Sequence, residues 1–188
     1  MNYSVDNIHK ICEEYEIENY TINPDGSIDV DDNVYLSNEG LTKLPLKFNN
    51  VSGDFNCSCN ELTTLLGSPN NVGGAFSCSD NELESLDGSP KSVGGDFWCD
   101  GNNLTTLEGS PNSVYGNFYC SKNKLTSLVG APKSVGGNFW CSNNNLTTLL
   151  GTSKSISIGG DFYCYMNNLT TLEGSPQSVG GNFYCDYN

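Results

Sequence analysis

Apolar and polar positions along most of this chain follow a unit that recurs about every 21 residues. A representative unit covers residues 117–137 and reads NFYCSKNKLTSLVGAPKSVGG. Its Phe and its Cys lie two residues apart, so they share one face of a short predicted strand, because strand side chains alternate between faces. Two leucines, a Gly-x-Pro segment and a Val-Gly-Gly follow. Self-similarity at this period is typical of a solenoid, in which each unit buries its apolar side against its neighbours.

The repeat predicts eight short strands. An early degenerate unit has Val34 and Leu36 in the places of Phe and Cys. Full units then start at Phe55, Phe76, Phe97, Phe118, Phe139, Phe162 and Phe183. The matching cysteines are Cys57, Cys78, Cys99, Cys120, Cys141, Cys164 and Cys185. The spacing widens from 21 to 23 residues only before Cys164, so a bulge is expected in residues 151–160, on the convex side.

The cysteines and the asparagines of the repeat both have an expected structural role. Seven of the nine cysteines hold one repeat position, which favours a reduced, buried ladder of small apolar side chains. They lack the close CxxC pairing of a structural zinc site, so no metal is expected there. An Asn stands three residues after each ladder Cys and precedes a turn. If buried, its amide must be satisfied, and we expect it to bond backbone groups at that turn.

The first 33 residues differ from the repeats. Residues 4–16 carry apolar positions at helical spacing and predict a short amphipathic helix, which would cover the first layer of the solenoid core. A Pro-Asp-Gly at 24–26 between two β-prone runs predicts a hairpin. We therefore expect an N-terminal cap over 1–33 and repeats over 34–188. The carboxylates of Asp29, Asp31 and Asp32 favour a solvated acidic turn over a calcium site, since the spacing is not that of an EF-hand.

Charge and hydropathy exclude several function classes. The formal net charge is −14, there is no arginine, and residues 1–39 hold ten acids against Lys10 alone. Nucleic-acid binding is not expected, because phosphate contacts need clustered Lys or Arg. No apolar run approaches the length of about 18 residues that a membrane helix needs. No basic segment followed by an apolar stretch marks a secretory signal, so a cytoplasmic location is expected.

The run CSxNxLTxLxGxP resembles leucine-rich repeats of the short bacterial class, as in effectors of Yersinia and Shigella, over roughly residues 34–188. The resemblance implies a leucine-rich repeat horseshoe with short parallel strands, an extended convex side and an N-terminal helical cap. The leading stretch NYTINPDGSIDV, followed by LTKLPLKF, is similar to uncharacterised leucine-rich repeat proteins of bacteriophages. That likeness implies a viral protein whose target is a protein of the bacterial host, such as an antiviral defence protein.

An outward aromatic stripe is the main candidate site. If Phe and Cys point inward, the residue between them points outward, and from the third full unit on it is aromatic. At about 4.8 Å per strand, these rings would form a stripe about 20 Å long. Exposed Trp and Tyr bordered by polar groups are typical of protein interfaces. The predicted partner-binding residues are Trp98, Tyr119, Trp140, Tyr163, Tyr165, Tyr184, Tyr187, Asp96, Asp100 and Asp161.

Alternatives to a protein-binding stripe remain open at this point. The rings could only stabilise the sheet by stacking. They could also stack on sugar or nucleotide rings, although such ligands prefer a pocket with convergent polar groups. The acidic surface could instead act as a decoy of nucleic acid, which predicts salt-sensitive binding.

Catalysis has little support in the sequence. His9, the one histidine, falls in the predicted helix, so no Ser-His-Asp or Cys-His set can be assembled. Neither an enzyme activity nor a cofactor is expected. The last strand of the repeats offers an open edge, and open edges favour pairing. A homodimer through this C-terminal edge is therefore also expected as a possible assembly.

Overall fold

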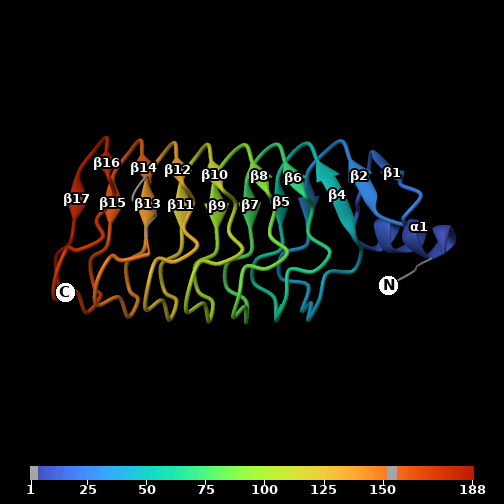
Figure 1. Ribbon diagram of the computed structural model, residues 1–188. Coiled ribbons are helices and arrows are strands. Elements are labelled where there is room, and N and C mark those ends of the chain that lie inside the picture. The colour runs from blue at the N-terminus through green and yellow to red at the C-terminus, as the bar shows by residue number, and fades with distance from the viewer. Residues whose placement is uncertain (1–3, 152–155) are drawn as a thin grey trace.

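The computed structural model describes residues 4–151 and 156–188, which form a mainly-β parallel solenoid of about seven turns. The units are stacked along one long axis with α1 at the N-terminal end (Figure 1). Each unit aligns in register with the next, so that Phe118 lies between Phe97 and Phe139. Each 21-residue repeat of the sequence therefore extends the stack by the width of one strand.

Two sheets run along the stack. Sheet B has eight strands and carries the Phe-x-Cys positions. Its strands are β3 (Val34–Tyr35), β5 (Phe55–Asn56), β7 (Phe76–Ser77), β9 (Phe97–Trp98), β11 (Phe118–Tyr119), β13 (Phe139–Trp140), β15 (Phe162–Tyr163) and β17 (Phe183–Tyr184). Their positions confirm the eight strands that the repeat predicts.

Sheet A has nine strands, and the sequence predicted only its first two, those of the hairpin. Its strands are β1 (Tyr20–Ile22), β2 (Ile28–Val30), β4 (Phe48–Val51), β6 (Asn71–Val72), β8 (Ser92–Val93), β10 (Ser113–Val114), β12 (Ser134–Val135), β14 (Ser157–Ile158) and β16 (Ser178–Val179). The eight strands predicted, one for each unit, therefore account for only one of the two sheets. A two-residue Ser-Val strand is too short to show an alternating pattern, and it forms only because neighbouring units pair with it.

The core between the sheets is one continuous cluster. The Phe and Cys of sheet B, the Val or Ile of sheet A and the two leucines of each unit are nearly all fully buried. The cysteines are free thiols, as the ladder interpretation predicts. In five successive units, the buried Sγ–H donates to a carbonyl of the next unit, from Cys57, Cys78, Cys99, Cys120 and Cys141. For Cys99 that acceptor is the Tyr119 carbonyl, at 3.2 Å. Of the expected bulge in residues 151–160, residues 152–155 lie outside the described residues.

The asparagine prediction is confirmed. In the central units, the Asn102 side chain donates to the carbonyls of Cys78 and Cys99 at 3.0 and 3.2 Å, and its oxygen accepts the Leu83 N–H at 3.0 Å. Each buried asparagine thus bonds its own unit and the preceding one. An unsatisfied buried backbone group would cost about 1–3 kcal/mol, so this ladder stabilises every turn.

The second glycine of each Val-Gly-Gly is fixed by the neighbouring unit. At Gly137, a Cβ would fall on Oδ1 of Asn117, which accepts the Asn138 N–H at 2.8 Å. The corresponding oxygens of Asp54, Asp96, Asn138 and Asp161 occupy the same place beside their glycines. Except at Gly95, which lies opposite Ala75, the side chain before each Phe therefore leaves no room for a Cβ at this corner.

The N-terminal residues pack onto the same core. Helix α1 (Val5–Glu14), capped by Ser4, buries Ile8 and Cys12. The predicted hairpin is confirmed, since β1 and β2 pair antiparallel with Gly26 in the turn at φ +76°. Strand β2 then pairs in parallel with β4, so the hairpin continues sheet A. Within residues 4–151 and 156–188, no helix has the length and apolar character that crossing a bilayer requires.

Candidate partner-binding face

The outer face of sheet B carries a stack of aromatic rings, here called the aromatic column. Its members come from five successive strands, β9 to β17, and are Trp98, Tyr119, Trp140, Tyr163 and Tyr184. Successive ring centroids lie 5.5, 4.4, 4.7 and 4.7 Å apart, and the planes are within 11° of parallel. The structure therefore brings together the five rings that the repeat spacing placed on one face.

Stacking decides which parts of the rings are accessible. A ring inside the column has a neighbour on each face, so mainly its edge and polar tip point outward. The first four members are accordingly half-buried, and Tyr184 is 36% exposed. Ring faces are free only at the two ends of the column. This arrangement does not offer a platform on which sugar or nucleotide rings could stack along its length.

Polar side chains border the column on the side that precedes each Phe. Asp96, Asn117, Asn138 and Asp161 each accept the backbone N–H of the next unit, at 2.6 to 2.8 Å. Asp161 also accepts the hydroxyl of Tyr163 at 2.8 Å. This hydrogen bond favours the neutral phenol and, with smaller contributions from desolvation and nearby charges, raises the pKa of Tyr163 to about 12.

Asp100 borders the column on the opposite side, two residues beyond Trp98. Its Oδ1 accepts the Ser121 N–H at 2.7 Å. Burial raises the pKa of its carboxyl to about 6, against the smaller opposing effect of that hydrogen bond. Desolvation and then the charges of Asp96 and Asp100 raise the pKa of Tyr119. Two carboxylates therefore flank the N-terminal end of the column.

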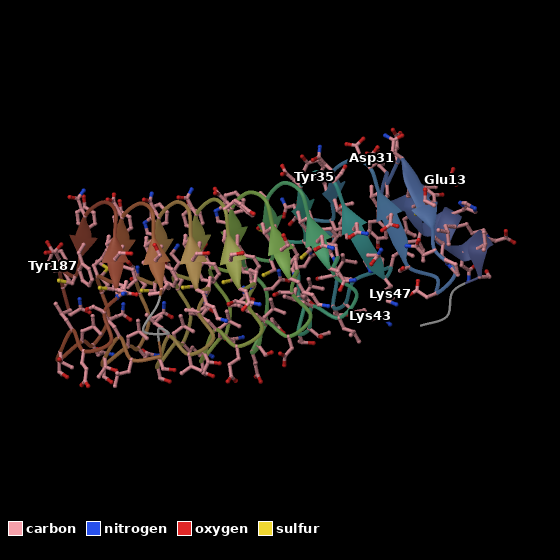
Figure 2. The ribbon with its side chains drawn as sticks, turned by 45° about the horizontal axis from the view of Figure 1, so that its top comes forward. Glu13, Asp31, Tyr35, Lys43, Lys47 and Tyr187 are labelled. Carbon is pink, nitrogen blue, oxygen red and sulfur yellow. The ribbon has the colours of Figure 1, made fainter. Side chains whose placement is uncertain are left out.

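Tyr165 and Tyr187 lie beside the other end of the column. The Tyr165 ring meets Tyr163 edge-on at 6.4 Å and 85°, outside the stack. Tyr187 is 83% exposed and marks the C-terminal end of the molecule (Figure 2). With Met166, Tyr184 and their neighbours they line a shallow hollow of about 270 Å³. All ten predicted site residues thus lie along the sheet B face or at its turns.

Tyr35 belongs to the same outward row but was not predicted as a site residue. It stands on β3 and is 58% exposed, at the N-terminal end of the row (Figure 2). The signal was available, because residues 35, 56, 77 and 98 follow the 21-residue spacing. It was missed because the first unit is degenerate and lacks the Phe and Cys that mark the others.

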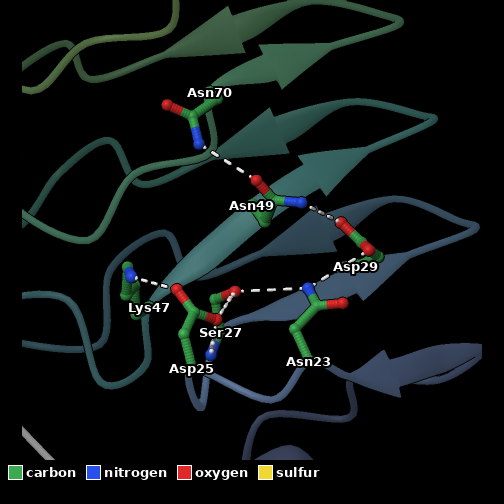
Figure 3. Close-up of polar contacts among 7 residues, drawn as sticks. All are labelled: Asn23, Asp25, Ser27, Asp29, Lys47, Asn49 and Asn70. Carbon is green, nitrogen blue, oxygen red and sulfur yellow. Dashed lines mark hydrogen bonds and ion pairs between the residues drawn. The ribbon is translucent and has the colours of Figure 1, made fainter.

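The hairpin carries Asp25 in its turn and Asp29 on β2, and both belong to a hydrogen-bonded network (Figure 3). Asp29 accepts the side-chain amides of Asn23, Asn49 and Asn50 at 2.8 to 3.1 Å. Asp25, in the hairpin turn, pairs with Lys47, which directly precedes β4. Because amide donors surround the Asp29 carboxylate, its oxygens already have partners. No group of three or more potential metal-binding side chains occurs in the described part of the chain.

No protein-family model, curated protein or solved structure matches this chain. The function of this chain is therefore inferred from the geometry of the sheet B face.

Proposed function

We propose that this protein is a non-enzymatic binding module that holds a protein partner on the outer face of sheet B. The supporting observation is the aromatic column, whose edges and polar tips form a continuous strip beside the carboxylates of Asp96, Asp100 and Asp161. Trp and Tyr contribute disproportionately to protein interfaces, because each buries a large apolar area and also offers a polar group.

Stacking also stabilises the sheet, so stacked rings alone do not indicate a binding role. The number of strands that carry rings supports such a role. The column starts at Trp98, whereas the same row has Asn56 and Ser77 on β5 and β7, in units whose core is equally well packed. A column that served stability alone would gain from rings in those two units as well. The restriction to the C-terminal five strands favours a binding role.

The alternatives make different demands. Sugar or nucleotide rings would need open ring faces, which the column offers only at its ends. A decoy of nucleic acid would need carboxylates as the main contact groups, and its binding would weaken strongly with salt. We therefore favour protein binding over small-ligand binding and over a decoy of nucleic acid.

The family and the biological setting are also proposals. We interpret the units as leucine-rich repeats that curve into a horseshoe, with α1 as the N-terminal cap. The phage resemblance of the leading stretch then suggests a partner in the host cytoplasm, with inhibition of an antiviral defence protein as one purpose. A homodimer through β16 and β17, the terminal strands of the two sheets, stays a prediction that molar mass by light scattering tests.

The test is affinity capture of partners from bacterial lysate. The parent is compared with a Trp98→Ala, Tyr119→Ala, Trp140→Ala variant of verified fold. A milder variant, Ser121→Lys, adds a long side chain beside the column and keeps every ring. The control carries Ser92→Ala and Ser134→Ala on sheet A. A partner retained by the parent and the control but lost by both column variants would support the proposal. Retention by all forms would place the site elsewhere and overturn it.

A further inference from the structure

The outward aromatic row of sheet B is interrupted at two strands. Tyr35 stands on β3 and Trp98 on β9, and between them β5 and β7 carry Asn56 and Ser77. Adjacent strands lie about 4.8 Å apart, so Tyr35 and Trp98 are separated by about 14 Å along the row. The row therefore lacks two rings between two aromatic residues.

A hollow of about 110 Å³ occupies this interruption, and we call it the notch. Small side chains create it. Ala75 is the residue before Phe on β7, where most other units have Asp or Asn. The Asn56 side chain is bonded to Ser58, whose N–H and hydroxyl it accepts at 3.0 and 2.7 Å. The residues of the notch used below are Tyr35, Asp54, Asn56, Ala75, Ser77 and Trp98.

Trp98 presents an aromatic ring to the notch. One face of its indole is covered by Tyr119, with centroids 5.5 Å apart, and the β7 side of the ring borders Ser77. A planar group of a ligand could therefore continue the stack on Trp98. The notch is too small for an extended polymer, and its volume suits one or two flat side-chain groups.

The charge around the notch is negative. Asp54 lines it and uses Oδ1 to accept the Ala75 N–H at 2.8 Å, while no hydrogen bond to its Oδ2 is found in the described part of the chain. Asp96 and Asp100, two residues to either side of Trp98, add negative charge nearby; their oxygens bond to Asn117 and Ser121 of the next unit, and neither lines the notch. No lysine lines the notch. A ligand that is both planar and cationic fits this combination of an open indole face and carboxylates.

We propose that the notch binds an arginine side chain of the partner, with its guanidinium stacked on Trp98 and paired with the carboxylate of Asp54. This inference rests on the proposed function, because it names the chemistry of the partner on the same face. The guanidinium is flat, permanently charged and able to stack and bond in one plane, whereas the lysine ammonium offers charge without a plane. The recognised element is an exposed loop or tail containing arginine.

The direct test uses capped peptides and the two indole N–H signals of the ¹⁵N-labelled protein. Trp98 borders the notch, whereas Trp140 is enclosed between Tyr119 and Tyr163 and serves as an internal reference. Three matched peptides are titrated, containing two arginines, two lysines or two citrullines. We expect the arginine peptide to shift the Trp98 signal, to leave Trp140 unmoved, and to bind about tenfold more tightly than the others. Equal affinities, or no shift at Trp98, would overturn the proposal.

Two variants test the geometry. Ser77→Tyr supplies a missing ring, covers the open face of Trp98 and should abolish the arginine-dependent shift while the protein stays folded. Asp54→Asn keeps an oxygen for the Ala75 N–H and should weaken arginine binding about tenfold. Asp87→Asn, an exposed charge elsewhere, is the control for net charge. Unchanged binding in Ser77→Tyr would remove the notch as the site.

The peptide titration can fail while the proposed function holds, and the reverse is also possible. Partner capture that depends on the column, together with no binding of the arginine peptide, would overturn the notch proposal alone. Arginine binding at Trp98 without any captured protein would support the notch and count against the proposed partner.

Discussion

Trp140 and Tyr163 lie with ring centroids 4.7 Å apart and planes 1° from parallel. On its other face, Trp140 contacts Tyr119 at 4.4 Å. These distances are close to the strand spacing of a sheet, about 4.8 Å, because in-register strands carry equivalent side chains directly beside one another. The backbone pairing of the solenoid therefore sets the geometry of its outer aromatic face.

We expect the energetic cost of removing a ring to depend on its place in the column. Trp140 has stacking partners on both faces, so Trp140→Ala should lower the free energy of unfolding by about 1–3 kcal/mol. Trp98 has one stacking partner, so Trp98→Ala should cost about 0.5–1.5 kcal/mol. Urea unfolding of both variants measures the difference. An equal loss would show that the rings do not interact as a stack.

The glycine at the corner of each unit gives a second prediction. Gly137→Ala should destabilise the protein by about 1–3 kcal/mol, because the added methyl would meet Oδ1 of Asn117. Gly95 is the matched control. The residue opposite it is Ala75, which has no side-chain oxygen, and its nearest atoms are backbone atoms at 3.0 Å or more.

A double-substituted variant separates the two causes. In an Asn117→Ala background, Gly137→Ala should cost no more than Gly95→Ala costs in the parent. Thermal and urea unfolding of the set measure this coupling. If Gly137→Ala were equally costly with and without Asn117, the conflict would lie with the backbone instead.

Asp100 should make stability depend on pH. Its pKa is raised from 3.8 to about 6 in the folded protein, so the folded state binds this proton more tightly than the unfolded chain does. The charged form therefore reduces stability at neutral pH, and this loss is relieved as the pH falls from about 6 towards 4. Asp100→Asn should raise the free energy of unfolding by about 1–3 kcal/mol at pH 7.5.

The control for Asp100 is the loss of one negative charge elsewhere. Asp87→Asn changes the net charge equally but alters an exposed side chain. The gain from Asp100→Asn should shrink towards zero between pH 6 and 4, as measured by urea unfolding at each pH. A gain that stayed constant over this range would contradict the raised pKa.

Thiol reactivity tests the cysteine ladder. Burial raises the pKa of Cys57 to about 12 and that of Cys99 well above its usual range, so these thiols should not react with Ellman's reagent while the protein is folded. Cys59 is exposed and should react first, and Cys185 is intermediate. Cys59→Ser should remove the fast phase. Rapid modification of several thiols in native protein would show that the ladder is open to solvent.

The sequence by itself determined the repeat, the inward positions and the ladder of buried asparagines. Phe118, Cys120 and Asn123 could be assigned to the core because alternation in a strand and a fixed 21-residue spacing are local properties of the chain. The row that became the aromatic column followed from the same spacing. The N-terminal hairpin and helix could also be predicted from local sequence. The Pro-Asp-Gly turn indicated the hairpin, and the helical spacing of Ile8 and Cys12 indicated the helix.

Only the tertiary structure decided the second sheet, the accessible parts of the rings and the notch. Ser134–Val135 is a strand because units 21 and 23 residues away pair with it, and no pattern within two residues can show that. Ring orientation depends on side-chain packing between units, so stacking of Trp140 on Tyr163 could not be read from the spacing. The notch between Tyr35 and Trp98 likewise exists because small side chains from separate strands become neighbours when the chain folds.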